Sequence, residues 1–260
     1  GASREFSSET INIEGRSRAA YLAAPYAPPR SFTPSVAFTA RQLAEQELTR
    51  AGLITGFDLQ WGLPDWLVPA GAWGYQALTP VSVIQQIAGA VGGYVNAHHY
   101  TRSLLVKSRY PHLPWEWDAA TPDHVIPIEA VKAMSLNWNE KPDYNAVYVS
   151  GERIGVTARV LRTGSAGDIP AQMATDPLIT HVDAARERGR SILGDTGRQA
   201  SVTITLPMYA MLGLVTPGEL LETGKTSKRW RGLVRSTSVS AEFSDSLIVR
   251  QTIGVERHYK

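Results

Sequence analysis

The 260-residue sequence has no cysteine, little net charge and no long apolar run. Without cysteine, the protein has neither a disulfide framework nor a thiolate metal site. The formal net charge of +2 gives no reason to expect nucleic acid or an anionic membrane as the main partner. No apolar run approaches the roughly 20 residues that cross a bilayer as a helix, so we expect no membrane span.

The first ten residues, GASREFSSET, lack an initiator methionine, a basic region and an apolar stretch. We therefore expect no signal peptide here, and this start is compatible with a fragment of a longer protein. The hydrophobic content of 43% and the charged content of 19% are typical of a globular protein with a core. The 16 prolines and 22 glycines predict many turns and short elements.

The first 110 residues predict a small domain of helices and strands. Residues 38–52 have a helical pattern, with Thr39 as the N-cap and Gln42 three positions later, which is the spacing of a capping box. A second helix is predicted to start with Pro80 at its first position and to end at a pair of glycines. Segments typical of strands follow each helix, which predicts an α+β domain over residues 1–110.

From residue 128 onward, β-branched and aromatic residues alternate with glycine or proline turns. This pattern predicts an antiparallel β-barrel-like domain over residues 128–260. One helix interrupts it near residues 181–193, where Thr180 and Asp183 have capping-box spacing. Residues 111–127 are rich in proline and tryptophan and form the predicted junction. The predicted fold class is therefore α+β and β-rich: a small helix–strand domain followed by an antiparallel β-barrel-like domain with one inserted helix.

No motif of catalysis or cofactor binding has the right spacing and context. TGKTSK at 223–228 resembles a phosphate-binding loop, but the preceding glycine is one position too far away and a strand follows it. DTG at 195–197 occurs in aspartic proteases, yet here it follows a predicted helix and indicates a turn. His98 and His99 are adjacent on a predicted strand, so their side chains would point to opposite faces. We expect no catalytic residue, no cofactor, no metal site and no enzyme activity.

The stretch RYPHLPWEWD at residues 109–118 has two interpretations. If it is extended, Glu116 and Asp118 share one face, and the aromatic residues form a sugar-binding platform or a glycosidase-like cleft. If it is a stiff junction, its prolines limit backbone freedom and its tryptophans anchor on both sides. We favour the junction. Six residues are candidates for a subunit interface or a platform, because aromatic residues concentrate at such contacts: Tyr110, Trp115, Trp117, Trp66, Trp73 and Trp230.

A basic cluster surrounds Trp230 and also has two interpretations. It consists of Lys225, Lys228, Arg229, Arg231 and Arg235. The cluster could contact nucleic-acid phosphates while the tryptophan stacks on a base. We favour the other interpretation, in which these residues form the solvated face of a hairpin and protect the edge of a sheet.

Two runs of the sequence resemble the tail hub proteins of long-tailed bacteriophages. The first is ALTPVSVIQQIAGAVGGYVNAHHYTRSLLVKSRYPHLPWEWD at residues 77–118. The second is KPDYNAVYVSGERIGVTARVLRTGSAGDIPAQMATDPLITHVDAARERGRSILGDTGRQ at residues 141–199. The resemblance covers most of the chain, from about Arg16 to about Phe243.

This resemblance implies a structural role. Such hubs are trimers at the tail tip or baseplate centre, with barrel-like domains in a ring around the tail lumen, and the architecture recurs in type VI secretion spikes. The implied partners are further copies of this chain in a homotrimer, the tail tube or distal tail protein, central spike or fibre proteins, and DNA passing through the lumen. The implied location is the virion tail, assembled in the bacterial host cytoplasm. The alternative is a tail-associated module that binds or processes carbohydrate or cell wall with the aromatic residues at 110–118.

Overall fold

The computed structural model describes residues 2–5, 10–13, 15–50, 56–209, 212–225, 228–243 and 247–259. The chain divides into two compact units. Unit 1 comprises Gly1–Lys107, Ser150–Thr157 and Thr175–Glu187, and unit 2 comprises Ser108–Val149, Ala158–Ala174 and Arg188–Lys260. Both units are discontinuous because the chain returns to unit 1 twice, whereas the sequence predicts consecutive segments over 1–110, 111–127 and 128–260.

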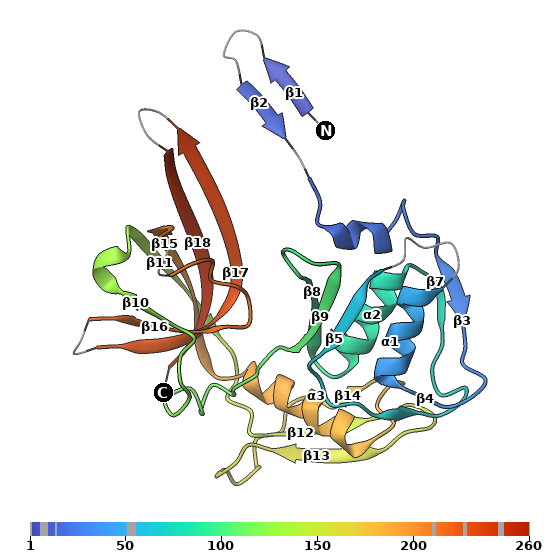
Figure 1. Cartoon of the computed structure of the whole chain (residues 1–260). Helices are drawn as coiled ribbons and strands as arrows, with labels where there is room; N and C mark the ends of the chain where they lie inside the picture. The colour runs from blue at the N-terminus through green and yellow to red at the C-terminus, as the bar shows by residue number, and fades with distance from the viewer. Residues whose placement is uncertain are drawn as a thin grey trace. The chain divides into compact units, whose positions relative to one another are not determined.

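Unit 1 contains two α-helices and several short strands (Figure 1). The helices α1 (Ala40–Thr49) and α2 (Pro80–Ala90) lie beside a three-stranded sheet of order β5-β9-β8. The strands of unit 1 are β1 (Ala2–Glu5), β2 (Thr10–Ile13), β3 (Arg30–Phe32), β4 (Phe38–Thr39), β5 (Asp58–Trp61), β6 (Leu67–Val68), β7 (Tyr75–Leu78), β8 (Gly93–Ala97) and β9 (Ser103–Ser108). A short 3-10 helix, η1 (Arg18–Leu22), precedes β3.

The start of α1 follows the sequence prediction. Thr39 Oγ1 accepts a hydrogen bond from Gln42 N at 3.2 Å, and Gln42 Oε1 accepts one from Thr39 N at 2.9 Å. This reciprocal pair is a capping box, so that prediction is confirmed. The helix buries Leu43, Ala44 and Leu48. The predicted end of the helix, at residue 52, lies outside the described residues.

Unit 2 is organised around a six-stranded sheet of order β10-β16-β17-β18-β15-β11. Its strands are β10 (His124–Pro127), β11 (Ala133–Glu140), β15 (Arg198–Pro207), β16 (Leu220–Gly224), β17 (Trp230–Phe243) and β18 (Leu247–His258). The pairing of β10 with β16 is parallel, and the neighbours from β16 to β11 pair antiparallel. The sheet curls into a half-barrel, in which β10 and β11 are the edge strands of the described sheet.

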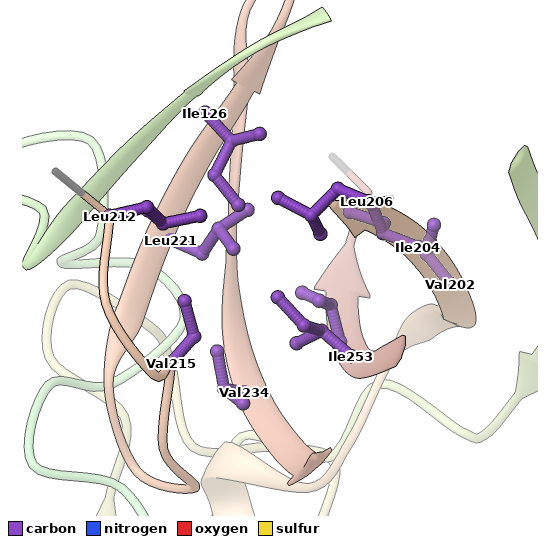
Figure 2. Packing of buried hydrophobic residues seen from close by; sticks show 10 residues of the cluster. Ile126, Val202, Ile204, Leu206, Leu212, Val215, Leu221, Val234 and Ile253 are labelled. Atoms are coloured by element: carbon purple, nitrogen blue, oxygen red, sulfur yellow. The ribbon is translucent and has the colours of Figure 1, made fainter. Parts of the chain in front are cut away.

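The larger of two buried apolar clusters in unit 2 lies on one face of this sheet. Ten apolar residues from the strands and from the 212–215 loop are buried there, and Figure 2 shows their side chains gathered together. Cross-strand pairs explain the packing, since Val202 lies opposite Val255 and Ile204 lies opposite Ile253. Alternate residues of a strand face the same side, so each of these strands contributes every second residue to the core.

A smaller sheet of order β13-β12-β14 and one α-helix complete the fold. Their bounds are β12 (Ala146–Ser150), β13 (Thr157–Leu161), β14 (Ala174–Thr175) and α3 (Val182–Gly194), and the 3-10 helix η2 (Ile128–Ala130) follows β10. The helix expected near residues 181–193 is thus confirmed as α3. The predicted capping box of Thr180 and Asp183 is wrong, because Asp183 N donates to His181 Nδ1 at 3.3 Å, and the Thr180 hydroxyl donates to the carbonyl of Leu67 at 2.6 Å.

The predicted fold class is confirmed: the protein is α+β and β-rich, with an inserted helix and a sheet that forms half a barrel. Among the residues that the structure describes, the helices are too short or too polar to cross a membrane.

Candidate functional site

The second half of the stretch 109–118 forms consecutive turns, from residue 114 to residue 119, and is not extended. Glu116 N donates to the carbonyl of Leu113 at 2.8 Å, and Leu113 N donates in return to Glu116 Oε2 at 3.0 Å. Trp117 Nε1 donates to the carbonyl of His112 at 3.0 Å, and Trp117 is buried. The prediction that Glu116 and Asp118 share one face of an extended segment is therefore wrong, because the Glu116 carboxylate closes the turn in which it lies.

Tyr110 is part of a buried polar network in unit 2. It is only 2% exposed, and its hydroxyl donates to Glu256 Oε1 at 2.7 Å. The guanidinium of Arg235 lies over the tyrosine ring, 4.4 Å from its centroid, and Arg235 Nε donates to Glu256 Oε2 at 2.8 Å. His258 Nε2 lies 2.8 Å from Glu256 Oε1. The Glu256 carboxylate thus holds three side chains in place.

The electrostatics of this network favour one fixed protonation state. Burial alone would raise the pKa of Glu256, but hydrogen bonds from His258, Arg235 and Tyr110, together with the charge of Arg235, lower that pKa to about 2. Burial and the neighbouring Glu256 carboxylate raise the pKa of Tyr110 above its ordinary value. At neutral pH the carboxylate is ionised and the phenol is protonated. Because neither pKa is near 7, this arrangement stabilises the fold and is not poised to exchange protons.

The DTG tripeptide forms the turn that the sequence predicts. Asp195 follows α3, and Gly197 has a positive φ of 81°, a conformation that glycine adopts without strain. Asp195 Oδ1 accepts a hydrogen bond from Lys141 Nζ at 2.6 Å, and Asp195 Oδ2 lies 3.3 Å from Arg109 Nη2. Two cations therefore hold this carboxylate at the end of the helix.

Three of the six predicted aromatic residues meet in one pocket of unit 2. Trp115, Trp117 and Trp230 line a pocket of about 590 Å³, together with Arg257 and other residues of unit 2. This volume lies within the range of sites that hold small molecules. From the sequence, Trp115 and Trp117 were predicted to lie in a junction and Trp230 in a hairpin. Nothing in the sequence indicated that the three side chains come together. Arg257 was not singled out in the sequence.

Most of the predicted basic cluster is paired inside unit 2. Arg231 Nε donates to Glu222 Oε2 at 2.8 Å, and Arg229 Nη1 donates to Glu222 Oε1 at 3.1 Å. Arg231 Nη1 also donates to the backbone carbonyls of Trp117, Asp118 and Ala120. The hairpin of β16 and β17 is confirmed, but both arginines bind Glu222, and Arg231 also binds the turns at 117–120.

The other two tryptophan candidates lie in the core of unit 1. Trp66 is 2% exposed and Trp73 is 4% exposed. Trp66 Nε1 donates to the carbonyl of Leu178 at 2.8 Å, and the Trp73 ring lies 5.5 Å from that of Tyr75. These contacts are those of core residues. A role of Trp66 and Trp73 in a subunit interface stays a prediction.

The histidine pair lies in a turn. β8 ends at Ala97, so the prediction that His98 and His99 lie on a strand is wrong. His98 Nδ1 accepts hydrogen bonds from Tyr100 N at 3.2 Å and from Thr101 N at 3.1 Å, which stabilises the turn. Within the described part of the chain, no three histidine, aspartate or glutamate side chains are grouped so that they could hold a metal ion.

One exposed apolar row was missed in the sequence. Met134, Leu136 and Trp138 lie at every second position of β11 and are 42%, 39% and 52% exposed. They pair with Ile204, Val202 and Ala200 of β15, which are buried. Directly paired residues share one face of a sheet, so this β11 row continues the core face onto an exposed edge strand. The period of two in MSLNWNE was the signal that could have revealed it.

No protein-family model and no curated protein matches this chain. Among solved structures, the chain is similar to the tail protein from Neisseria meningitidis MC58, with a TM-score of 0.64 and 12% sequence identity over 99% of this chain and 77% of that chain. A second similar structure is the 43 kDa tail protein of prophage MuSo2 from Shewanella oneidensis, with a TM-score of 0.48 and 14% identity over 90% of this chain and 66% of that chain. The likeness to the Neisseria protein shows that the two chains share a fold.

Proposed function

We propose that this chain is a structural component of a phage or prophage tail, located at the tail tip or baseplate as part of the hub. The observation that carries the proposal is the fold, which is similar to that of the Neisseria tail protein over 99% of the chain. The resemblance of residues 77–118 and 141–199 to tail hub proteins supports the same role. In this role the chain connects the tail tube or distal tail proteins to the central spike or fibres.

A hub of this kind acts through contacts between copies, and the β11 row is the surface that we assign to such a contact. Exposed apolar side chains on an edge strand favour association, because both the apolar face and the strand edge gain a partner. A ring with threefold symmetry uses heterologous contacts, in which one surface of a copy meets a different surface of the next. We therefore expect a homotrimer in which β11 meets another face of the neighbouring copy.

Light scattering tests the assembly. The wild-type chain is expected to have three times the monomer mass, and Leu136→Glu is expected to have the monomer mass, because a buried unpaired charge opposes the contact. Ser135→Glu is the matched control, since it adds the same charge to an exposed position on the opposite face of β11 and is expected to leave the trimer intact. A monomeric wild-type chain, or equal dissociation of both variants, contradicts the assigned contact.

A genetic experiment tests the tail role itself. Deleting the gene from the phage or prophage that encodes the chain is expected to abolish infective tailed particles, and wild-type protein supplied in trans is expected to restore them. Particles that remain tailed and infective after the deletion contradict the proposal.

A module that binds carbohydrate is the second candidate. It is favoured by one observation, the convergence of Trp115, Trp117 and Trp230 on a single pocket of unit 2. Pockets with aromatic walls and a few polar groups are typical of small-molecule sites. If this were the function, the chain would bind glycan as a monomer, and replacing Trp115 would weaken that binding.

A further inference from the structure

The pocket of unit 2 that contains Trp115, Trp117 and Trp230 carries a surplus of positive charge. Five arginines and two aspartates line it, in addition to His258. The arginines are Arg162, Arg198, Arg229, Arg231 and Arg257, and the aspartates are Asp118 and Asp143. A concave surface with an excess of one charge concentrates ligands of the opposite charge.

Three of these five arginines have carboxylate partners within about 3 Å in unit 2. Arg229 and Arg231 both bind Glu222, and Arg162 Nη1 donates to Asp143 Oδ1 at 2.9 Å. His258 is paired with Glu256 at 2.8 Å. Asp143 therefore offsets the charge of Arg162, and Glu222 offsets one of the two charges of Arg229 and Arg231.

The other two arginines of the lining, Arg198 and Arg257, are less well neutralised. Arg198 Nε lies 3.5 Å from Glu140 Oε1, and both side chains of this pair are more than half exposed, so water screens it. In the described part of the chain, Arg257 is half-buried and forms no ion pair with a carboxylate. Arg257 is thus a half-buried cation on the wall of the pocket that lacks an acidic partner. An anionic ligand would supply that partner.

Aromatic rings fix the orientation of the Arg257 guanidinium. Its Cζ lies 4.6 Å from the ring centroid of Trp230 and 4.4 Å from that of Tyr259. Stacking uses the flat faces of the guanidinium and leaves its N–H edge for hydrogen bonds in its own plane. This planar edge matches the two oxygens of a carboxylate or phosphate group, which it binds through two parallel hydrogen bonds.

The same stacking disfavours a ligand that binds by lying flat on the rings. Arg257 covers Trp230 and Tyr259, and Trp138 packs on Tyr259 with ring centroids 4.7 Å apart. The guanidinium of Arg162 covers Trp115 at 4.8 Å. A nucleobase or the apolar face of a neutral sugar would have to displace a guanidinium, whereas an oxyanion binds to the guanidinium where it is.

The size of the pocket indicates that the anionic group is part of a larger polar molecule. At about 590 Å³ the pocket is much larger than a single phosphate or carboxylate needs. Asp118 and Asp143 also line it, and carboxylates are suited to accept hydrogen bonds from hydroxyl groups. An anion attached to a body rich in hydroxyl groups satisfies both parts of the lining.

We propose that this pocket binds an acidic sugar, meaning a sugar that carries a carboxylate or phosphate group, with Arg257 as the main anion-binding residue and Arg198 in support. The proposal names the ligand class of the second candidate function, and it does not depend on the role of the chain in a tail. If the chain is a tail component, the pocket gives it a binding site for an acidic glycan; if it is not, the site is unchanged.

Calorimetric titration of the whole chain tests the proposal with glucuronic acid, glucose 6-phosphate, glucose, inorganic phosphate and AMP. Both acidic sugars are expected to bind at least tenfold more tightly than glucose and inorganic phosphate, because only they use the guanidinium and the hydroxyl-binding groups together. Equal affinities for glucose and glucuronic acid would contradict the assigned anion site. An affinity for inorganic phosphate equal to that for glucose 6-phosphate would show that the sugar contributes nothing to binding. An affinity for AMP higher than that for both acidic sugars would show that the ligand is a nucleotide and not a sugar.

Two further measurements locate the site. Arg257→Met keeps the length of the side chain but removes its charge, and it is expected to weaken the binding of acidic sugar at least tenfold. Arg250→Met is the matched control, because it changes an arginine of the same strand that pairs with exposed Glu242 and does not line the pocket. This variant is expected to leave the affinity for acidic sugar unchanged.

In the wild-type chain, NMR titration with an acidic sugar is expected to shift the indole N–H signals of Trp115 and Trp230. Shifts confined to Trp66 or Trp73 in unit 1 would contradict the location of the site. Because this measurement uses the wild-type chain, it does not depend on whether Arg257→Met folds.

Discussion

The Glu256 network of unit 2 provides a quantitative prediction for stability. Glu256 has a pKa of about 2 in the folded chain, against an ordinary value of 4.5. A lowered pKa in the folded state stabilises the protein at every pH above the unfolded value, and this contribution is lost as the pH falls through the folded value. The difference of about 2.5 units between the two pKa values adds about 3 kcal/mol to the free energy of unfolding at pH 7 and about 1 kcal/mol at pH 3. Below pH 2 it vanishes.

Glu256→Gln removes the charge and keeps the shape of the side chain. We expect it to lower the free energy of unfolding by about 3 kcal/mol at pH 7, because the half-buried Arg235 guanidinium loses its counter-charge. The measurement is urea unfolding followed by tryptophan fluorescence at pH 7 and pH 3, with amide exchange in β15 and β18 to assign the transition to unit 2. The difference between the two proteins should shrink to about 1 kcal/mol at pH 3.

Glu242→Gln is the matched control. Glu242 lies 3.1 Å from Arg250, but its side chain is 70% exposed, so the loss should stay below about 1 kcal/mol at both pH values. The argument is refuted if Glu256→Gln and Glu242→Gln have the same effect at pH 7. It is also refuted if the effect of Glu256→Gln does not decrease between pH 7 and pH 3.

Two further substitutions test the core contacts of each unit separately. Glu47 is 1% exposed and bonds Arg30, Arg50 and the Tyr75 hydroxyl in unit 1, so Glu47→Gln should cost about 3–5 kcal/mol in urea unfolding of that unit. Burial and Glu47 together raise the pKa of Tyr75 to about 12, and ultraviolet titration of Glu47→Gln should show that pKa lowered toward 10; a pKa that stays at about 12 would contradict the assignment. In unit 2, a Cβ at position 194 would lie 2.8 Å from Tyr110 Cδ2. Gly194→Ala should therefore destabilise unit 2 by about 1–2 kcal/mol in a thermal melt, and a higher melting temperature would show that helix propensity outweighs the clash.

Features set by neighbouring residues were predictable from the sequence. The capping box of α1 depends on Thr39 and Gln42, which are three positions apart, and both hydrogen bonds form as expected. The change from helical to β-rich composition likewise predicted the fold class, because the period of apolar residues differs between helices and strands.

Features set by distant residues were not predictable in the same way. Thr180 has the spacing of a capping box, but its hydroxyl bonds Leu67, which is 113 positions away. Residues 109–118 have the composition of a stiff linker, yet the second half folds into turns that Arg231 binds from more than 100 positions further along the chain. The pocket combines these turns with strands β17 and β18, so its residues are far apart in the sequence.

The central claim is that this chain is part of a phage or prophage tail, and its location in the particle tests that claim most directly. Purified particles of the phage that encodes it can be labelled with gold-conjugated antibody against the chain and viewed by electron microscopy. We predict label at the end of the tail that is farthest from the head. Label on the head, or none on particles whose tails are intact and accessible to antibody against another tip protein, would contradict the claim.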